Sequence, residues 1–356
     1  MGITERNPNT KQDLLIILLF FVAVFSNATL GWVSLQLIFL LTVFKKEMRS
    51  IESHNGSSHV NWVVPSILLG SGFWIGLSSE DAFLHQVGVI GCLTGIGGML
   101  GWFPVPRATT LFSNEDSIAS LVTGTLLPVL CAAIFLFRCV EDGGWSERDL
   151  AILGVVSLFS LAISGLRLMG PLSPQQRCRL SILTILSQAN IVSVLLGWQK
   201  IFPERNGSAS SNIISSENLF LTILIVETSA VLLLIWSCRS DSNDQTQGFR
   251  STLFRKLRPV LPNGSLPAIA GVLTLSGFPL FPGSWWRFKL LTALILPYEQ
   301  SMITQLSEPH LGFVALALGY AACSLIVAIG QLRILPTLLE REEIPSLEPS
   351  LNRSHG

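Results

Sequence analysis

The segment from Leu273 to Leu290 constrains the fold of this chain more than any other. It is apolar, but helix-breaking residues interrupt its middle: Gly277, Pro279, Pro282 and Gly283. Two cations, Arg287 and Lys289, follow at once. Proline has no backbone N–H donor, and in lipid a broken backbone persists only where protein or water covers it. The segment therefore predicts a discontinuous transmembrane helix, and a cation beside the break marks a candidate functional site.

Composition places the whole chain in a membrane. Of its 356 residues, 49% are hydrophobic and only 13% are charged, whereas a soluble domain carries about 25% charged residues. Apolar runs of about 20 residues recur, which is the length that crosses a bilayer as a helix. We therefore predict an all-α polytopic membrane protein of about ten transmembrane helices. A large soluble helical protein would need polar faces that these runs lack. The net charge of zero gives no case for nucleic-acid binding.

We predict one transmembrane domain over residues 1–336 and a polar tail over 337–356. The expected spans are 12–26, 29–45, 60–78, 84–102, 117–138, 149–169, 180–199, 217–238, the broken span 263–297, and 311–332. Lysine and arginine gather in alternate loops, and such residues accumulate on the cytoplasmic side. Both termini are therefore expected on the cytoplasmic (or matrix) side. We expect a bacterial plasma membrane, with an organellar inner membrane as the alternative.

The motifs of bond-making chemistry are missing from the sequence. The six cysteines are scattered and form no CxxC pair, so metal clusters and redox motifs have no support. There is no P-loop, no H-E-x-x-H and no Ser-His-Asp set. We therefore predict no catalytic residue, no bound cofactor and no metal in this chain.

The broken segment resembles a family pattern, S-L-A-G-L-P-P-x-x-G-F-x-x-K-F. This pattern belongs to the antiporter-like membrane subunits of proton-pumping NADH:quinone oxidoreductase (respiratory complex I) and of related multisubunit cation/proton antiporters. Gly277, Pro279, Gly283 and Phe288 fall in register, and Arg287 stands at the place of the family's lysine. Four further segments resemble the family in the same order along the chain: residues 31–37, 60–63, 179–190 and 329–333. Residues 31–37 are most similar to subunit N of complex I, which is subunit 2 in mitochondria.

The resemblance covers about residues 12–335, in a chain that looks shortened at both ends. It implies the antiporter-like fold and a membrane-arm subunit that performs no redox chemistry itself. NADH, FMN, iron–sulfur clusters and quinone would be bound by partner subunits, and other membrane subunits would flank this one.

The departures from the family concern its proton relay. The family moves protons along buried glutamate and lysine residues, whose pKa values can be tuned by burial. This chain has Gln36 at the glutamate place, and Asn61 and Met99 at two lysine places. Arg287 keeps a charge, but arginine effectively never deprotonates in a protein. The resemblance therefore implies a structural role or an altered proton path.

Several residues remain candidates for a central polar axis, each beside a simpler interpretation. Gln36 is either a neutral relay or a side chain that joins helices by hydrogen bonds. Arg287 either sets the field of the axis or snorkels to the interface, and Lys289 is a snorkelling cation or an anion partner. Gln188 follows the family motif. Asn61 stands where the relay would have a lysine.

Glu227 lies in the middle of an apolar span and has no evident counterpart in the family. A charge there must be protonated or paired, because a lone charge in lipid is costly. We predict that it pairs with Arg287.

Two groups of residues are predicted to have structural roles. The glycines Gly91, Gly95, Gly97, Gly98 and Gly101 have the small-residue spacing of close helix packing. Several tryptophans are predicted to lie at the membrane interface: Trp62, Trp74, Trp102, Trp285 and Trp286.

Three functions remain open at this point. The first is a divergent subunit of a complex I type oxidoreductase. The second is a membrane part of a multisubunit cation/proton antiporter or another ion-coupled complex, and the third is an interaction-only scaffold. The identity of the partners separates the first two, and proton flux separates both from the third.

Overall fold

A computed structural model describes most of the predicted helical regions of the chain. The described residues are 8–25, parts of 30–41, 67–72, 75, 81–99, 121–142, 145–172, 174–201, 215–240, 265–304 and 311–336. Asn61, Trp62, Trp74, Gly101, Trp102 and the tail 337–356 lie outside them, as do the side chains of residues 96–99.

The described residues form helices and no strand, which confirms the all-α prediction. The labelled helices are α1 (Pro8–Phe25), α4 (Ala82–Met99), the π-helical turn η1 (Val122–Leu126), α6 (Leu127–Asp142), α7 (Glu147–Leu168), α8 (Pro174–Ile201), α9 (Ser216–Ser240), α11 (Ser265–Ser276), α12 (Pro282–Thr304) and α13 (Leu311–Leu332). The expected break between residues 276 and 282 is present, because α11 ends and α12 begins there.

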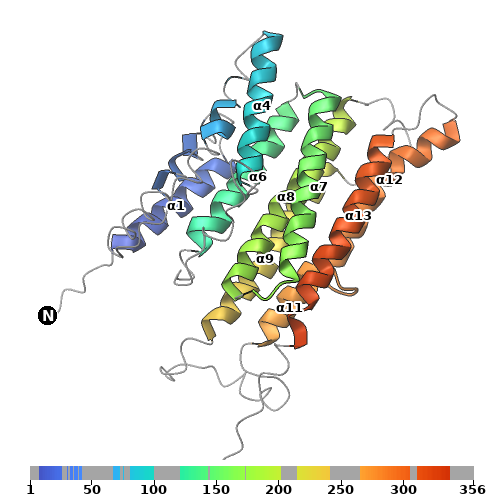
Figure 1. The fold of residues 1–356 in the computed structure, drawn as a ribbon. Helices are drawn as coiled ribbons and strands as arrows, with labels where there is room; N and C mark the ends of the chain where they lie inside the picture. Colours follow the sequence, from blue (N-terminus) through green and yellow to red (C-terminus); the bar gives the residue numbers. More distant parts are fainter. Residues whose placement is uncertain are drawn as a thin grey trace, which may run out of the picture.

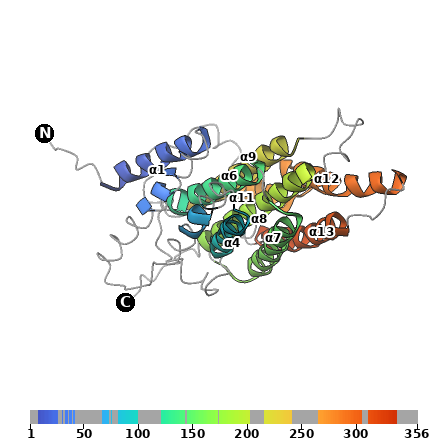
Figure 2. The same ribbon diagram turned by 90° about the horizontal axis from the view of Figure 1, so that it is seen from above.

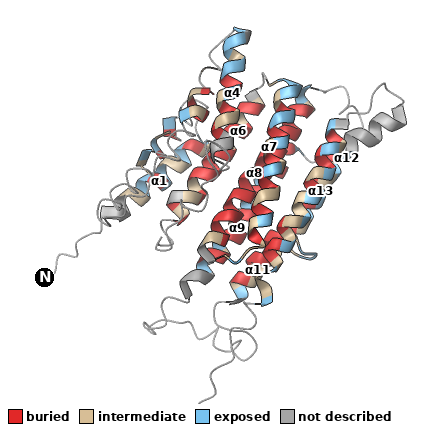
Figure 3. Cartoon of the chain, viewed as in Figure 1, coloured by how far each residue is buried: buried red, intermediate tan, exposed pale blue. Residues whose placement is uncertain are grey.

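Helix α8 is the centre of the molecule. It lies between α7 and α9 (Figures 1 and 2) and also packs on α6. Its most apolar 18-residue stretch is entirely buried. The outer helices are buried on one face and exposed on the other (Figure 3). Their exposed positions are largely apolar, for example Val155, Ile225, Leu318 and Leu325. Apolar side chains on the outer face of a helix bundle are what a bilayer favours.

Within the part of the chain that the structure describes, four helices are long and apolar enough to cross a membrane: Glu147–Leu168, Gln176–Ile201, Ser216–Trp236 and Gly312–Leu332. Shorter apolar helices occur at Gln12–Phe25, Phe83–Gly95 and Leu266–Ser276. The chain is therefore a helical protein suited to a membrane.

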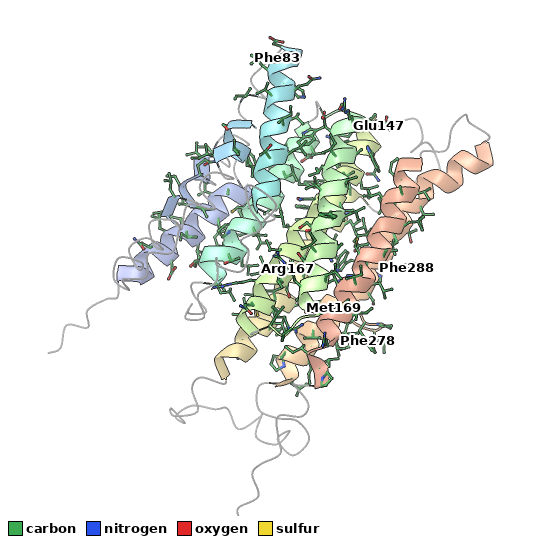
Figure 4. The ribbon with its side chains drawn as sticks, viewed as in Figure 1. Phe83, Glu147, Arg167, Met169, Phe278 and Phe288 are labelled. Atoms are coloured by element: carbon green, nitrogen blue, oxygen red, sulfur yellow. The ribbon has the colours of Figure 1, made fainter. Side chains whose placement is uncertain are left out.

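The start of α7 is defined by a capping box. The Ser146 hydroxyl accepts a hydrogen bond from the Asp149 N–H at 3.2 Å, and the Asp149 carboxylate accepts one from the Ser146 N–H at 3.3 Å. Both donors would otherwise lack partners at a helix N-terminus. Figure 4 labels Glu147 at this end of α7 and Arg167 at the other.

Small residues also allow close packing outside the broken helix, for example at Gly72, Gly91 and Gly165. A Cβ atom on Gly72 would lie 2.5 Å from the Cys92 N atom, and one on Gly91 would lie 2.9 Å from the Gly72 Cα atom. The predicted packing role is thus confirmed for Gly91. Gly165 of α7 meets α13 in the same way, with a Cβ position 2.9 Å from the Val327 N atom.

Candidate functional site

The candidate site begins at the C-terminus of α11. The Phe278 N–H donates to the Leu273 carbonyl at 3.0 Å, and the Gly277 N–H donates to the Thr274 carbonyl at 3.0 Å. Gly277 has φ = 67°, the left-handed conformation that glycine adopts without a Cβ penalty. These two bonds form a Schellman motif, so the local sequence ends the helix on a specific residue.

The start of α12 packs directly against the end of α11. Pro282 is the first helical residue, where the missing N–H costs no hydrogen bond. Gly283 is buried, and a Cβ atom there would lie 1.8 Å from the Thr274 carbonyl oxygen. Only glycine fits this contact, because real Cβ atoms do not approach so closely. The break thus brings the first turns of α12 against the free end of α11.

Arg287 joins the two halves of the break to α9. Its Nη2 atom lies 3.3 Å from Oε1 of Glu227, and both side chains are buried. The same Nη2 atom donates to the Leu275 carbonyl, one of the last carbonyls of α11. A helix C-terminus carries a partial negative charge, so the guanidinium is compensated from two directions. The predicted pair of Glu227 with Arg287 is therefore confirmed as a contact.

Gly277 makes room for this guanidinium. A Cβ atom at position 277 would lie 2.8 Å from Nη1 of Arg287 and 3.0 Å from its Cδ atom. The glycine therefore serves both the left-handed turn and the approach of Arg287. Snorkelling of Arg287 to the interface is excluded in this structure, since the side chain points inward to a buried carboxylate.

Further polar atoms surround the pair. Trp286 lies next to the Glu227 carboxylate, and its ring centroid is 5.3 Å from Cζ of Arg287. Tyr320 of α13 lies within electrostatic range of both charges and beside Ser324. Trp286 was predicted at the interface, and this prediction was wrong: the side chain is fully buried. The sequence does not distinguish the two adjacent tryptophans, whereas in the structure Trp285 is half exposed and Trp286 is buried.

Lys289 does not join the buried pair. Its Nζ atom lies 3.4 Å from the ring centroid of Trp285, a cation–π contact on the outer side of α12. In Figure 4 the neighbouring residues Phe278 and Phe288 lie at the margin of the bundle. The outward placement of Lys289 agrees with a cation that keeps its head away from the core.

The other axis candidates lie apart from the pair or outside the described residues. Gln188 is fully buried on α8, and neither its oxygen nor its nitrogen meets a hydrogen-bond partner among the described residues. The side-chain oxygen and nitrogen of buried Asn190 also lack a hydrogen-bond partner among the described residues. Gln36 is half-buried, and the helical residues of 30–41 lie beside α1, at the opposite edge of the molecule from α12 (Figures 1 and 2). Gln36 is therefore not brought to Arg287. Asn61 is not among the described residues.

A second buried cation was missed by sequence reasoning. No role was predicted for Arg177, yet its Nη1 atom donates to the Leu168 carbonyl at 3.2 Å and to the Gly330 carbonyl at 2.8 Å. It therefore caps the C-terminal ends of α7 and α13 together. Arg333 donates to the Met169 carbonyl at the same end. The sequence carries no signal for this role, because Arg177 lies in the first turn of α8 and reaches the ends of α7 and α13 only through the packing of the helices.

The described residues contain no group of three or more His, Cys, Asp and Glu side chains that could hold a metal ion. In comparisons with known proteins, the chain matches no family model and no curated protein sequence.

Proposed function

We propose that this chain is a membrane-arm subunit of a proton-translocating complex similar to respiratory complex I, with an altered proton path. The observation that carries the proposal is the buried Glu227–Arg287 pair at the junction of α11 and α12. A buried ion pair contributes little net stability, so its presence needs another reason. Ionisable groups within membrane segments are by default assigned to ion pathways.

The two members of the pair have different roles in this proposal. The Arg287 guanidinium stays protonated, so it supplies a fixed positive charge. Glu227 is the member able to exchange a proton. When Glu227 is protonated, Arg287 keeps the Leu275 carbonyl as its partner. The guanidinium therefore has a hydrogen-bond acceptor whether the Glu227 carboxyl group is ionised or protonated.

The resemblance of the broken segment to antiporter-like subunits supports the choice of complex. Redox chemistry would then take place in partner subunits that bind NADH, FMN, iron–sulfur clusters and quinone. Gln36 and Asn61 replace ionisable residues of the family pattern, which favours a path through Glu227 or a purely structural role over a complete relay.

The composition of the native complex tests this assignment. The tagged native chain is extracted in mild detergent, run on a native gel stained for NADH dehydrogenase activity, and the band is analysed by mass spectrometry. We expect flavin and iron–sulfur subunits in the same band. A band that holds small antiporter subunits and no redox subunit would instead establish the antiporter alternative, and a band without either would leave a scaffold.

Proton transport tests the role of the pair within that complex. Membrane vesicles carrying Glu227→Gln should build a smaller pH gradient on NADH than the unchanged chain. Glu217→Gln is the matched control, because Glu217 is exposed in the first turn of the same helix. Equal gradients in both variants would show that Glu227 carries no proton and would reduce the chain to a structural subunit.

A further inference from the structure

The outer face of α13 is an exposed apolar stripe that ends in a cation. Leu318, Leu325 and Ile329 are between 50% and 68% exposed, and their spacing of seven and four residues places them on one side of the helix. Arg333 follows Ile329 by four residues and is also exposed. Its N–H still donates to the Ile329 carbonyl at 3.1 Å, so Arg333 continues the same side of the helix. We call these four residues the α13 stripe.

The end of the stripe has the dimensions of one bilayer leaflet. Eight residues separate Leu325 from Arg333, which is about 12 Å along a helix. The hydrocarbon core of one leaflet is about 15 Å thick. An acyl chain that lies on Leu325 and Ile329 would therefore have its headgroup at the level of Arg333.

The Arg333 side chain is held in place by the neighbouring helix. Its Nη1 atom donates to the Met169 carbonyl, which follows the last residue of α7. This bond uses only one of the N–H donors of the guanidinium. The planar guanidinium presents its other donors in a fork that matches the oxygen atoms of a phosphate. An exposed and oriented guanidinium is thus present at the end of the apolar stripe.

A second guanidinium lies behind the first. Arg177 is buried, donates to the carbonyls of Leu168 and Gly330, and lies within electrostatic range of Arg333. Neither arginine forms an ion pair with a carboxylate that the structure describes. The acidic residues of α7 lie in its first turn, and Figure 4 labels Glu147 there, at the other end from Arg167. Two cations held close together without a described counter-charge produce a positive potential that attracts an anion.

We propose that the α13 stripe binds an anionic phospholipid, with the phosphate on Arg333 and an acyl chain along Ile329 and Leu325. Arg177 strengthens the attraction from behind. Lysine and arginine accumulate on the cytoplasmic side, where the leaflet carries the anionic lipids, so the lipid comes from that leaflet. Every residue of the site belongs to this chain, so the site goes beyond the proposed function and does not depend on it.

Native mass spectrometry of the full-length chain tests the site. The protein is released from nanodiscs that contain equal amounts of phosphatidylglycerol and phosphatidylcholine, and the lipids that stay bound are counted. The unchanged chain should retain several-fold more phosphatidylglycerol. Arg333→Gln should bring the two lipids to parity, and Arg333→Lys should keep the preference because it keeps the charge. Arg148→Gln, at an exposed arginine near the start of α7, is the matched control and should change nothing.

Three results would overturn the proposal. They are equal retention of the two lipids by the unchanged chain, a preference that survives Arg333→Gln, and an equal loss in Arg148→Gln. The same experiment in excess inorganic phosphate separates a lipid site from a bare phosphate site. Phosphatidylglycerol should stay bound, and its displacement would show that the acyl chain takes no part.

Two further variants test the apolar stripe and the competing occupant. Ile329→Asn should lower the retention of both lipids several-fold and leave the preference unchanged, and retention that does not fall would overturn the seat of the acyl chain. The sequence continues past Arg333 to Glu340, Glu342 and Glu343. Changing these three residues to glutamine should leave the retained phosphatidylglycerol unchanged. A several-fold gain would show that the acidic tail occupies Arg333 and would overturn the lipid site.

Discussion

The buried polar groups of helix α8 and those of the α9–α12 junction find their partners in different ways. The hydroxyls of α8 bond carbonyls of their own helix: Ser181 to Arg177, Thr184 to Ser181, Ser187 to Leu183 and Ser193 to Ala189. The charges at the junction instead depend on partners from other helices. Arg287 reaches Glu227, which is 60 residues away in the chain.

This difference shows which buried polar groups are expected to carry function. The hydroxyl of a serine in a helix can donate a hydrogen bond to a carbonyl of its own helix, so replacing the serine costs little stability. A charge must have a partner that only the tertiary structure supplies, so each member of the pair depends on the other. The predictions below test this contrast from the largest expected effect to the smallest.

Loss of the guanidinium should be the most damaging change. Arg287→Met leaves Glu227 buried without a counter-charge and leaves the Leu275 carbonyl uncapped. Breaking a buried pair in this way costs about 3–5 kcal/mol of unfolding free energy. The measurement is the SDS-dependent unfolding equilibrium in mixed micelles. Arg148→Met, at an exposed position of α7, is the matched control, and equal losses at both sites would contradict the contrast.

Filling the α11–α12 contact should be the next most damaging. Gly283→Ala places a Cβ atom 1.8 Å from a backbone carbonyl oxygen, which must push the two half-helices apart. We expect the free energy of unfolding to fall by at least about 1–3 kcal/mol. The native complex should also migrate more slowly on a native gel. Gly312→Ala is the control, because its Cβ would lie 3.5 Å from the nearest atom. A Gly283→Ala protein as stable as the control would show that the junction is loosely packed.

The outer cation should matter much less than the inner one. Lys289→Gln removes a cation–π contact on Trp285, which is worth about 0.5–1 kcal/mol at exposed sites. Proton transport should stay unchanged, since Lys289 does not touch the pair. A transport defect as large as that of Glu227→Gln would place Lys289 on the path.

The smallest effect is expected on α8. Ser187→Ala removes a 3.2 Å hydrogen bond to the Ser160 hydroxyl of α7. Such interhelical bonds contribute about 0.6 kcal/mol on average in a membrane protein. The unfolding equilibrium should therefore shift only slightly. A loss comparable to that of Arg287→Met would mean that α8 is part of the same charged network.

Much of the fold was predictable from sequence because it depends on local rules. Low charge and long apolar runs predicted an all-α protein, and Gly277 with its neighbouring prolines predicted the break. The pairing of Glu227 with Arg287 was predictable because a buried charge in lipid needs an opposite charge. The apolar spans contain few cationic residues that could supply it. Each of these inferences needs only residue type and spacing.

The remaining features depend on packing direction, which spacing does not reveal. Trp285 and Trp286 are adjacent, yet one faces outward and the other lies beside Glu227. Tyr320 went unnoticed because it stands alone in an apolar helix and meets the pair only through the docking of α13. Gln36 was placed on a common axis with Arg287, but the two segments lie at opposite edges of the molecule.

A double-mutant cycle on Glu227 and Arg287 tests the central claim most directly. The free energy of unfolding is measured for Glu227→Gln, Arg287→Met, the double variant and the unchanged chain. If the two charges depend on each other, the double variant loses less than the sum of the single losses, by about 1–3 kcal/mol. Losses that add within about 0.5 kcal/mol would show that the residues act independently, and the junction would then hold no functional ion pair.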